Sequence, residues 1–357
     1  NTAVGYQALT ANTTGYINTA LGYQALYSNT TGAANVAVGN QSLYNNTAPS
    51  LTAVGYRAAY NNTTGIENVA IGYQSLYANT TGANNTAVGF SALTTNTTAS
   101  NNTAIGTRAL LLNTTGANNT AVGYQSLYAN TTASNNTAVG YQSLFSNTTA
   151  SENTSVGQFS GYSITTGYRN TFIGASAGNG GFGAGAFTTG AYNISIGFAA
   201  GASASNRNNS IVIGTPYAIV DKGENTGFIQ PNGGGVYQGN NSSSWSTTSD
   251  RRLKKNIVDN NEGLEKIAAI RVRNFEYRTA EEVTELPAHT VIDKAGVQLG
   301  VIAQELREVC PDCVKEETTG VLSVDSDNVF WHMVNAIKQL KTELDSVKAE
   351  LATLKGA

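Results

Sequence analysis

A repeat of 17 residues dominates the first two-thirds of this chain. Its motif is Asn-Thr-Ala-Val-Gly-Tyr-Gln-Ser-Leu, followed by Asn-Thr-Thr-Gly or a variant. A short fixed period is typical of stacked, nearly identical coils, in which each repeat contacts its neighbours. The motif's glycine recurs at steps of 17, apart from one step of 16 and one of 23: Gly5, Gly22, Gly39, Gly55, Gly72, Gly89, Gly106, Gly123, Gly140, Gly157, Gly174, Gly197 and Gly214.

Each repeat is too short for a pair of helices but suffices for two short strands and two turns. We expect Thr-Ala-Val-Gly-Tyr to form a strand, and Asn-Thr-Thr-Gly a turn, because Asn and Gly tolerate left-handed backbone angles. Equivalent residues would stack at about 4.8 Å per coil. Asn stands four residues before the glycine in eleven of thirteen copies, which predicts a hydrogen-bonded ladder. The leucines predict an apolar ladder: Leu9, Leu26, Leu43, Leu76, Leu127 and Leu144.

The predicted fold class is an all-β repetitive solenoid, a parallel β-roll, over residues 1–214. Ala and Gly alternate with Val or Ile along the expected strand, which predicts that both of its faces are buried. One face would line the coil, and the other would meet neighbouring chains in a trimer. The tyrosines either stack between coils or bind sugars. The pattern resembles the head repeats of trimeric autotransporter adhesins.

Charge divides the chain near residue 249. Residues 1–249 hold nine charged side chains, and the other 34 of the 43 lie in residues 250–357. Between repeat and boundary, residues 215–248 are rich in Gly, Ser and Asn, which predicts a junction. The net charge of −3 gives no reason to expect a nucleic-acid partner. We also expect no membrane insertion. Because the chain starts inside a repeat, we expect it to be a fragment of a longer protein.

A different set of motifs begins at this boundary. Residues 249–257 read Ser-Asp-Arg-Arg-Leu-Lys-Lys-Asn-Ile, and Gly-Leu-Glu-Lys-Ile, Val-Arg-Asn-Phe-Glu-Tyr and Leu-Gly-Val-Ile-Ala-Gln-Glu follow in that order. In this order, residues 249–357 resemble the intramolecular chaperone domain of endosialidases and other phage tailspikes, the peptidase S74 family. The resemblance implies a small α+β domain that drives homotrimer assembly of a fibre. It also implies that this domain then cuts the chain between Ser249 and Asp250.

The resemblance maps the family's serine–lysine dyad onto Ser249 and Lys254. A serine hydroxyl needs a base at neutral pH, and lysine can serve where burial lowers its pKa. Two routes to the scissile carbonyl stay open: the side chain of Asp250, through a six-membered ring, and a serine of another protomer. Without the resemblance, the same residues would be a cap or turn before a solvated basic run. Many relatives carry a His just before the Gly-x-Ile-Ala-Gln segment, and the nearby residue in this chain is Gln298. This difference bears on the rate of cleavage rather than on assembly.

The C-terminal segment carries an uninterrupted heptad pattern. Its apolar residues are spaced alternately by three and four, which is typical of a coiled coil: Phe330, Met333, Ile337, Leu340, Leu344, Val347, Leu351 and Leu354. We predict a parallel coiled coil over residues 329–355. The alternative is an amphipathic helix that packs on its own domain. The choice of three chains rests on the family, because the pattern does not determine their number.

Two cysteines form a C-x-x-C pair, Cys310 and Cys313. Such a pair can be redox-active or bind zinc. Because only His289 and His332 could complete a zinc site, we predict thiols in a turn after a helix, with no metal and no cofactor.

These features together predict a structural or adhesive segment of a phage tail fibre. We expect it to be a homotrimer, located on the virion, that binds a host cell-surface receptor, with a glycan as one candidate. The alternative is a bacterial trimeric surface adhesin that keeps its trimerisation domain. A glycan-degrading tailspike is less favoured, because such enzymes use two adjacent carboxylates. The repetitive part offers only four: Glu67, Glu152, Asp221 and Glu224.

Overall fold

The computed structural model describes residues 1–179, 186–214, 221, 223–230, 236–239, 246–247, 251–279, 281–283, 292, 294–316 and 320–356. The chain forms two compact units, Asn1–Ser249 and Asp250–Ala357, which are described separately. Over the described ranges, none of the helices combines the length and apolar character needed to cross a bilayer.

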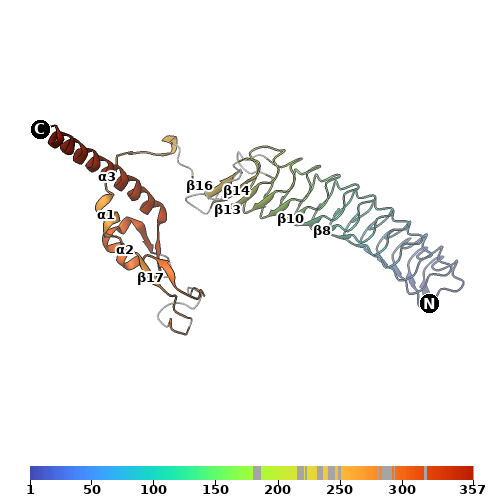
Figure 1. Ribbon diagram of the computed structural model, residues 1–357. Coiled ribbons are helices and arrows are strands. Elements are labelled where there is room, and N and C mark those ends of the chain that lie inside the picture. The colour runs from blue at the N-terminus through green and yellow to red at the C-terminus, as the bar shows by residue number, and fades with distance from the viewer. Residues whose placement is uncertain are drawn as a thin grey trace. The chain divides into compact units, whose positions relative to one another are not determined.

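The first unit is a parallel β-solenoid of about 13 turns (Figure 1). Each turn contributes one short strand, and successive strands pair in parallel. The strands are β1 (Thr2–Val4), β2 (Thr19–Leu21), β3 (Val36–Val38), β4 (Thr52–Val54), β5 (Val69–Ile71), β6 (Thr86–Val88), β7 (Thr103–Ile105), β8 (Thr120–Val122), β9 (Thr137–Val139), β10 (Thr154–Val156), β11 (Thr171–Ile173), β12 (Ile194–Ile196) and β13 (Ile211–Gly214). The sheet continues through β14 (Thr226–Gln230), and then antiparallel through β15 (Val236–Gly239) and β16 (Ser246–Thr247).

The strands stack in register, so that equivalent residues form rows along the solenoid. Ala70 on β5 pairs with Ala87 on β6, and both are fully buried. The flanking residues of each strand point outward, and Ile71 is 39% exposed. The inward face of each strand is buried as expected, and burial of the outward face against neighbouring chains stays a prediction.

The expected second strand of each coil is absent from the described coils. Gln24 and Leu26 have φ angles of 54° and 52°, and most other coils repeat this pair of left-handed residues. Alternating left-handed residues curl the chain too tightly for an extended strand. The left-handed angles thus fall on the Gln and Leu positions, and on a residue that follows the Asn-Thr-Thr-Gly turn, such as Ala34 with a φ of 57°, rather than on the turn itself. Coils still bond there, since the Leu26 amide donates to the Ser42 carbonyl at 3.0 Å.

The predicted asparagine ladder is confirmed. The Asn85 side chain accepts from the Asn102 backbone amide at 3.0 Å and donates to the Ala99 carbonyl at 2.9 Å. A second ladder, from the Asn of the Asn-Thr-Thr-Gly turn, runs beside it, with Asn96 donating to Asn79 at 2.9 Å. Both rows are buried, so each side-chain amide satisfies backbone groups that water cannot reach.

The apolar rows are confirmed too. Every leucine of the predicted ladder is buried. Tyr124 and Tyr141 stack with ring centroids 5.1 Å apart, and both stay more than 40% exposed. A second aromatic row, which the sequence analysis did not identify, includes Tyr27 and Tyr44, stacked at 5.0 Å.

The second unit is a small mixed domain. Among its described residues, the helices are η1 (Arg251–Leu253), α1 (Leu264–Ala269), α2 (Ala303–Val309), η3 (Pro311–Cys313) and the long α3 (Ser326–Lys355). Two antiparallel pairs complete it: β17 (Arg273–Phe275) with β18 (Gln298–Gly300), and β19 (Val314–Glu316) with β20 (Leu322–Val324). Its buried cluster is Leu306, Cys310 and Cys313, with Ile270, Val301, Val309, Val314 and Val329 against it.

Candidate assembly and cleavage site

The expected scissile bond lies outside the described residues, because these include neither Ser249 nor Asp250. The predicted base, Lys254, follows η1, and its backbone amide donates to the Arg251 carbonyl at 3.1 Å. Lys254 is exposed, and so are the apolar side chains of Leu253 and Val258, at 75% and 83%. The single protomer therefore does not provide the burial that a lysine base needs.

The Gly-Leu-Glu-Lys-Ile motif attaches α1 to one side of α3. A Cβ on Gly263 would lie 2.4 Å from the Ala336 amide nitrogen, so only glycine permits this approach. The Leu264 amide donates to the Gln339 side chain at 2.6 Å. The Asn335 side chain donates to two carbonyls of the loop before α1, Asn260 at 2.8 Å and Glu262 at 3.1 Å. A largely polar side of α3 thus holds the helix on its own domain.

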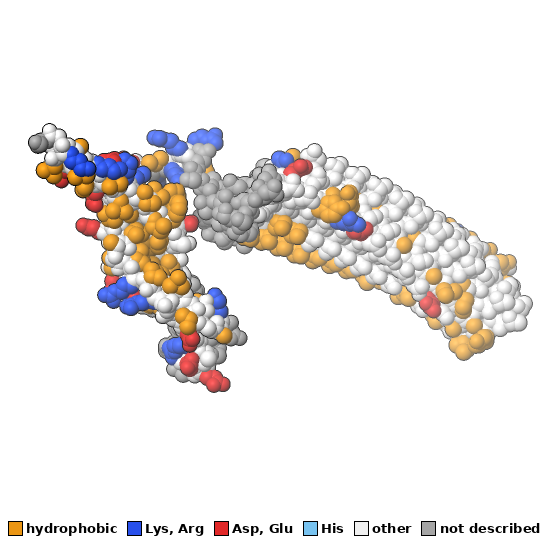
Figure 2. Space-filling model, viewed as in Figure 1, with side chains coloured by type: hydrophobic (Ala, Val, Ile, Leu, Met, Phe, Trp, Pro, Cys, Tyr) orange, Lys and Arg blue, Asp and Glu red, His pale blue; other side chains and the backbone are white. Residues whose placement is uncertain are grey.

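The opposite side of α3 is an exposed apolar seam, the eight heptad residues from Phe330 to Leu354. Phe330 is 54% exposed, Ile337 64% and Leu354 76%. An apolar groove of about 190 Å³, lined in part by Ile270 and Val301, adjoins the seam at Phe330 and Met333. Figure 2 shows hydrophobic side chains gathered over the visible face of this unit. Exposed apolar surface of this extent is typical of an interaction surface.

Two further motifs meet in the β17–β18 pair. Phe275 pairs with Gln298, and Arg273 reaches Glu305 on α2 with two hydrogen bonds, of 3.0 and 2.8 Å. The hydrogen bond from Arg273 holds the pKa of Glu305 below its usual range. Gln298 donates to the Gly296 carbonyl at 2.8 Å, so it stabilises the turn before β18. The motifs recognised in the sequence thus converge in one domain.

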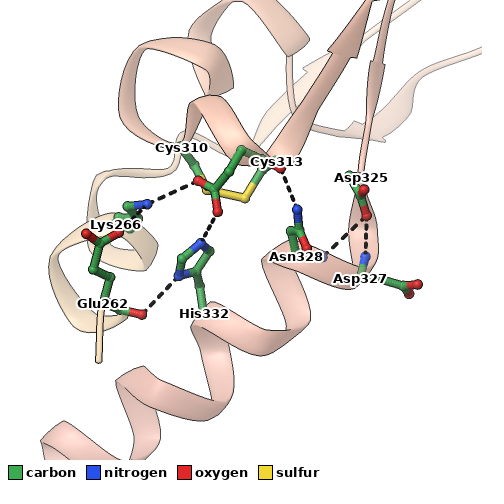
Figure 3. Close-up of a disulfide and its surroundings, with 9 residues drawn as sticks. Glu262, Lys266, Cys310, Cys313, Asp325, Asp327, Asn328 and His332 are labelled. Carbon is green, nitrogen blue, oxygen red and sulfur yellow. Dashed lines mark hydrogen bonds and ion pairs between the residues drawn. A yellow bond between two sulfur atoms is a disulfide. The ribbon is translucent and has the colours of Figure 1, made fainter. Parts of the chain in front are cut away.

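A compact polar cluster forms at η3 (Figure 3). Cys310 and Cys313 do lie in a turn after α2, but they are joined in a disulfide, so the prediction of two thiols is wrong. His332 on α3 directs Nε2 to Asp312 at 2.8 Å and Nδ1 to the Glu262 carbonyl at 2.9 Å. Lys266 on α1 contacts Asp312 at 3.1 Å. The sequence pattern indicates the cysteines and His332 as candidate ligands, whereas Asp312 stands unmarked inside the C-x-x-C.

The cluster perturbs its own titrating groups. The hydrogen bond to the Glu262 carbonyl, and then the one to Asp312, raise the pKa of His332. His332 first, and Lys266 after it, hold the pKa of Asp312 below its usual range. Both shifts favour a charged pair between α3 and η3.

Two of the four carboxylates of the solenoid, Asp221 and Glu152, take structural positions. Buried Asp221 accepts from the Ser203 amide at 3.1 Å and its hydroxyl at 2.5 Å, and it lies 3.6 Å from Arg207. Glu152 pairs with Arg169 at 2.6 Å. Each of these acids is paired with an arginine.

Residues 249–315 fit the peptidase S74 family, described as the chaperone of endosialidase. The match begins at the residue where the sequence analysis placed the cleavage, and it covers β17, β18 and the C-x-x-C. This domain implies a role in assembling the trimer of a tail fibre or tailspike, and the β-solenoid before it is consistent with the repeat region of a tail fibre. Residues 249–315 of the chain thus form a chaperone-of-endosialidase domain.

Proposed function

We propose that this chain is a segment of a phage tail fibre whose chaperone domain assembles it as a homotrimer and then cuts the Ser249–Asp250 bond. The observation that carries the assembly step is the apolar seam of α3, which the rest of its own protomer leaves exposed. Its heptad spacing fits a parallel coiled coil with two further copies of the same helix.

In this proposal, burial of the seam is the main driving force for association. Burying one large apolar side chain contributes about 1.5–3 kcal/mol, and each protomer offers eight. Glu343 and Lys348 flank the seam and can pair between parallel chains. Such pairs contribute about 0.5 kcal/mol each, so they favour the parallel direction more than they add strength.

The shaft offers a second self-complementary surface. The outward Val and Ile rows of the strands run beside the exposed aromatic row, and Ile105, Ile173 and Tyr124 are each about 40% exposed. Because both rows repeat with every coil, three copies in register would present matching apolar stripes along their whole length. The same aromatic row supports contact with a host receptor, including a glycan, wherever trimer packing leaves it accessible.

Cleavage then depends on assembly. Lys254 is exposed in the protomer, whereas a lysine that takes the proton of Ser249 needs a desolvated position. Packing of three copies around the exposed segment that begins at η1 would exclude water and bring the groups together. In this proposal Ser249 of one protomer attacks the Ser249 carbonyl of another, or the Asp250 side chain attacks it through a six-membered ring. Lys254 takes the proton of the serine hydroxyl and passes it to the leaving amine of Asp250, which becomes the new N-terminus. A water molecule then hydrolyses the acyl intermediate and leaves Ser249 with a free carboxylate. The released fibre would be extracellular, as part of the virion.

The decisive test is the intact mass of the expressed chain, wild type beside Ser249→Ala and Lys254→Ala. We expect a wild-type product that ends at Ser249, and uncut chain in both variants, with trimers in sedimentation for all three. Uncut wild-type chain in a trimer would overturn the protease role and leave a permanent trimerisation domain. Monomeric wild type would overturn the assembly role.

A further inference from the structure

The cluster at η3 is built like a closed metal site. One ligand atom from each of Cys310, Asp312, Cys313 and His332 lies within 4.8 Å of the other three. Two zinc ligands in a tetrahedral site are roughly 3–4 Å apart, so small side-chain movements suffice to place an ion among these four atoms. Both cysteines are fully buried and His332 is 4% exposed, whereas the Asp312 side chain is 46% exposed, so three of the four ligands are held away from water.

The groups around the cluster support ligation. The His332 Nδ1 position faces the Glu262 carbonyl at 2.9 Å, so a hydrogen there leaves the Nε2 lone pair directed into the cluster. A backbone carbonyl on the far imidazole nitrogen is a common support of metal-ligating histidines. Lys266, 3.1 Å from Asp312, offsets the negative charge that two thiolates and a carboxylate would leave around a divalent ion.

We propose that the reduced form of this domain binds one zinc ion through Cys310, Cys313, His332 and Asp312. A thiol reductant first converts the disulfide into two thiols, and two reductant molecules are oxidised to their own disulfide. Zn²⁺ then replaces the two thiol protons and the hydrogen between Nε2 and Asp312, and these protons pass to solvent. With four protein ligands the site is structural, because a catalytic zinc keeps one position open.

The position of the site indicates a structural role for the ion. Its sulfur ligands belong to the buried cluster beside α2, whereas His332 belongs to α3 and Glu262 precedes α1. Zinc would therefore join the base of the seam-bearing helix to the body of the domain before oxidation is possible, and the disulfide would preserve the turn afterwards. A redox enzyme is the less suitable interpretation, because catalytic cysteines are at least partly exposed.

The test uses the full wild-type chain as expressed, with any cleavage products kept together. The protein is reduced with a phosphine under argon, its two thiols are counted in denaturant, and Co²⁺ is titrated as a spectroscopic probe. We expect one Co²⁺ per chain, with the absorption of a tetrahedral ion and a thiolate charge-transfer band, and its displacement by one Zn²⁺. Fully reduced protein that shows no thiolate band and retains no zinc after gel filtration would overturn the proposal.

Variants then identify the ligands. We expect Cys313→Ser to weaken the charge-transfer band, because one of its two thiolates is lost, and His332→Gln to weaken zinc binding by about 10-fold or more. The matched control is His289→Gln, the other histidine of the chain, which should leave binding unchanged. Equal zinc affinity in His332→Gln and wild type would mean adventitious binding and would also overturn the site. If a variant fails to fold, the cobalt titration of the wild type still decides.

Discussion

Single residues in the solenoid act through rows rather than through isolated contacts. Gly89 shows how strict a row can be: its φ is 135°, and a Cβ there would lie 2.6 Å from the Gly106 carbonyl oxygen of the next coil. The same approach recurs from coil to coil, so the glycine period found in the sequence reports a backbone contact between neighbours. A side chain at any one copy would separate two coils.

The asparagine ladder makes a quantitative prediction. Asn85→Ala leaves the buried Asn102 amide without its partner, whereas the Ala99 carbonyl still accepts from the Asn96 side chain at 3.0 Å. Each unsatisfied buried group costs about 1–3 kcal/mol, so we expect a clear fall in the unfolding midpoint of the shaft. The measurement is denaturant unfolding followed by circular dichroism.

The matched control for that variant is Asn84→Ala, one residue earlier. Asn84 is exposed, and Ala34 occupies the equivalent position with a φ of 57°, so alanine fits that backbone. It should change the midpoint little. Equal destabilisation by Asn84→Ala and Asn85→Ala would contradict a special role for the buried ladder.

Among the elements, α3 depends on its first turn and on its seam. Asp325 is its N-cap and accepts from the backbone amides of Asp327 and Asn328 at 3.2 and 3.4 Å. Lys315 first, and these amides after it, lower the pKa of Asp325 below its ordinary 3.8. The carboxylate therefore stabilises the folded state above pH 3.8, and this contribution is lost as the pH falls through the lower folded value.

We predict that Asp325→Ala destabilises the chaperone domain by about 1 kcal/mol at pH 6 and by less at pH 3. Thermal unfolding at the two pH values measures the difference. Asp325→Asn is the matched control, because Asn also caps helices but does not titrate. A loss in Asp325→Ala that is the same at both pH values would rule out the charged cap as its cause.

The seam makes a separate prediction about association. Leu344→Lys puts a charge at the centre of the proposed coiled coil, where three copies would face one another, and should reduce the trimer to monomer. Thr342→Lys adds the same charge on the opposite side of α3 and should leave the trimer intact. Sedimentation velocity distinguishes them, and an intact trimer in Leu344→Lys would show that the seam is not the interface.

The sequence predicts features that recur in every repeat better than features that depend on contacts between residues far apart in the chain. The solenoid and its Asn and Leu rows follow from a period that repeats thirteen times, so every copy reinforces the same inference. The presence of only one strand per coil does not follow from this period, because left-handed angles at Gln24 and Leu26 are unusual for those residue types. The cluster around His332 was missed as a unit, because Glu262 and Asp312 come to it from distant positions.

For the whole molecule, the proposed order of assembly followed by cleavage implies that the mature shaft persists because it unfolds slowly, not because it can refold at equilibrium. Loss of the chaperone domain would leave stacked coils whose unfolding is slow and whose refolding lacks a template. We predict that the cut shaft, fully denatured and then diluted, does not recover its trimer, whereas uncut Ser249→Ala does. Equal recovery of both would show that the domain is not needed for folding.

The in-register sheet also allows the length of the shaft to change in steps of one repeat. The coil between Gly39 and Gly55 is one residue short, yet Val36 still pairs with Thr52. The step from Gly174 to Gly197 is six residues longer than the usual 17, yet Thr171 still pairs with Ile194. Gain or loss of a whole repeat should therefore change the length by about 4.8 Å and leave every kind of contact as it was. Fibre reach can thus evolve by copy number alone, independently of the domain that assembles it.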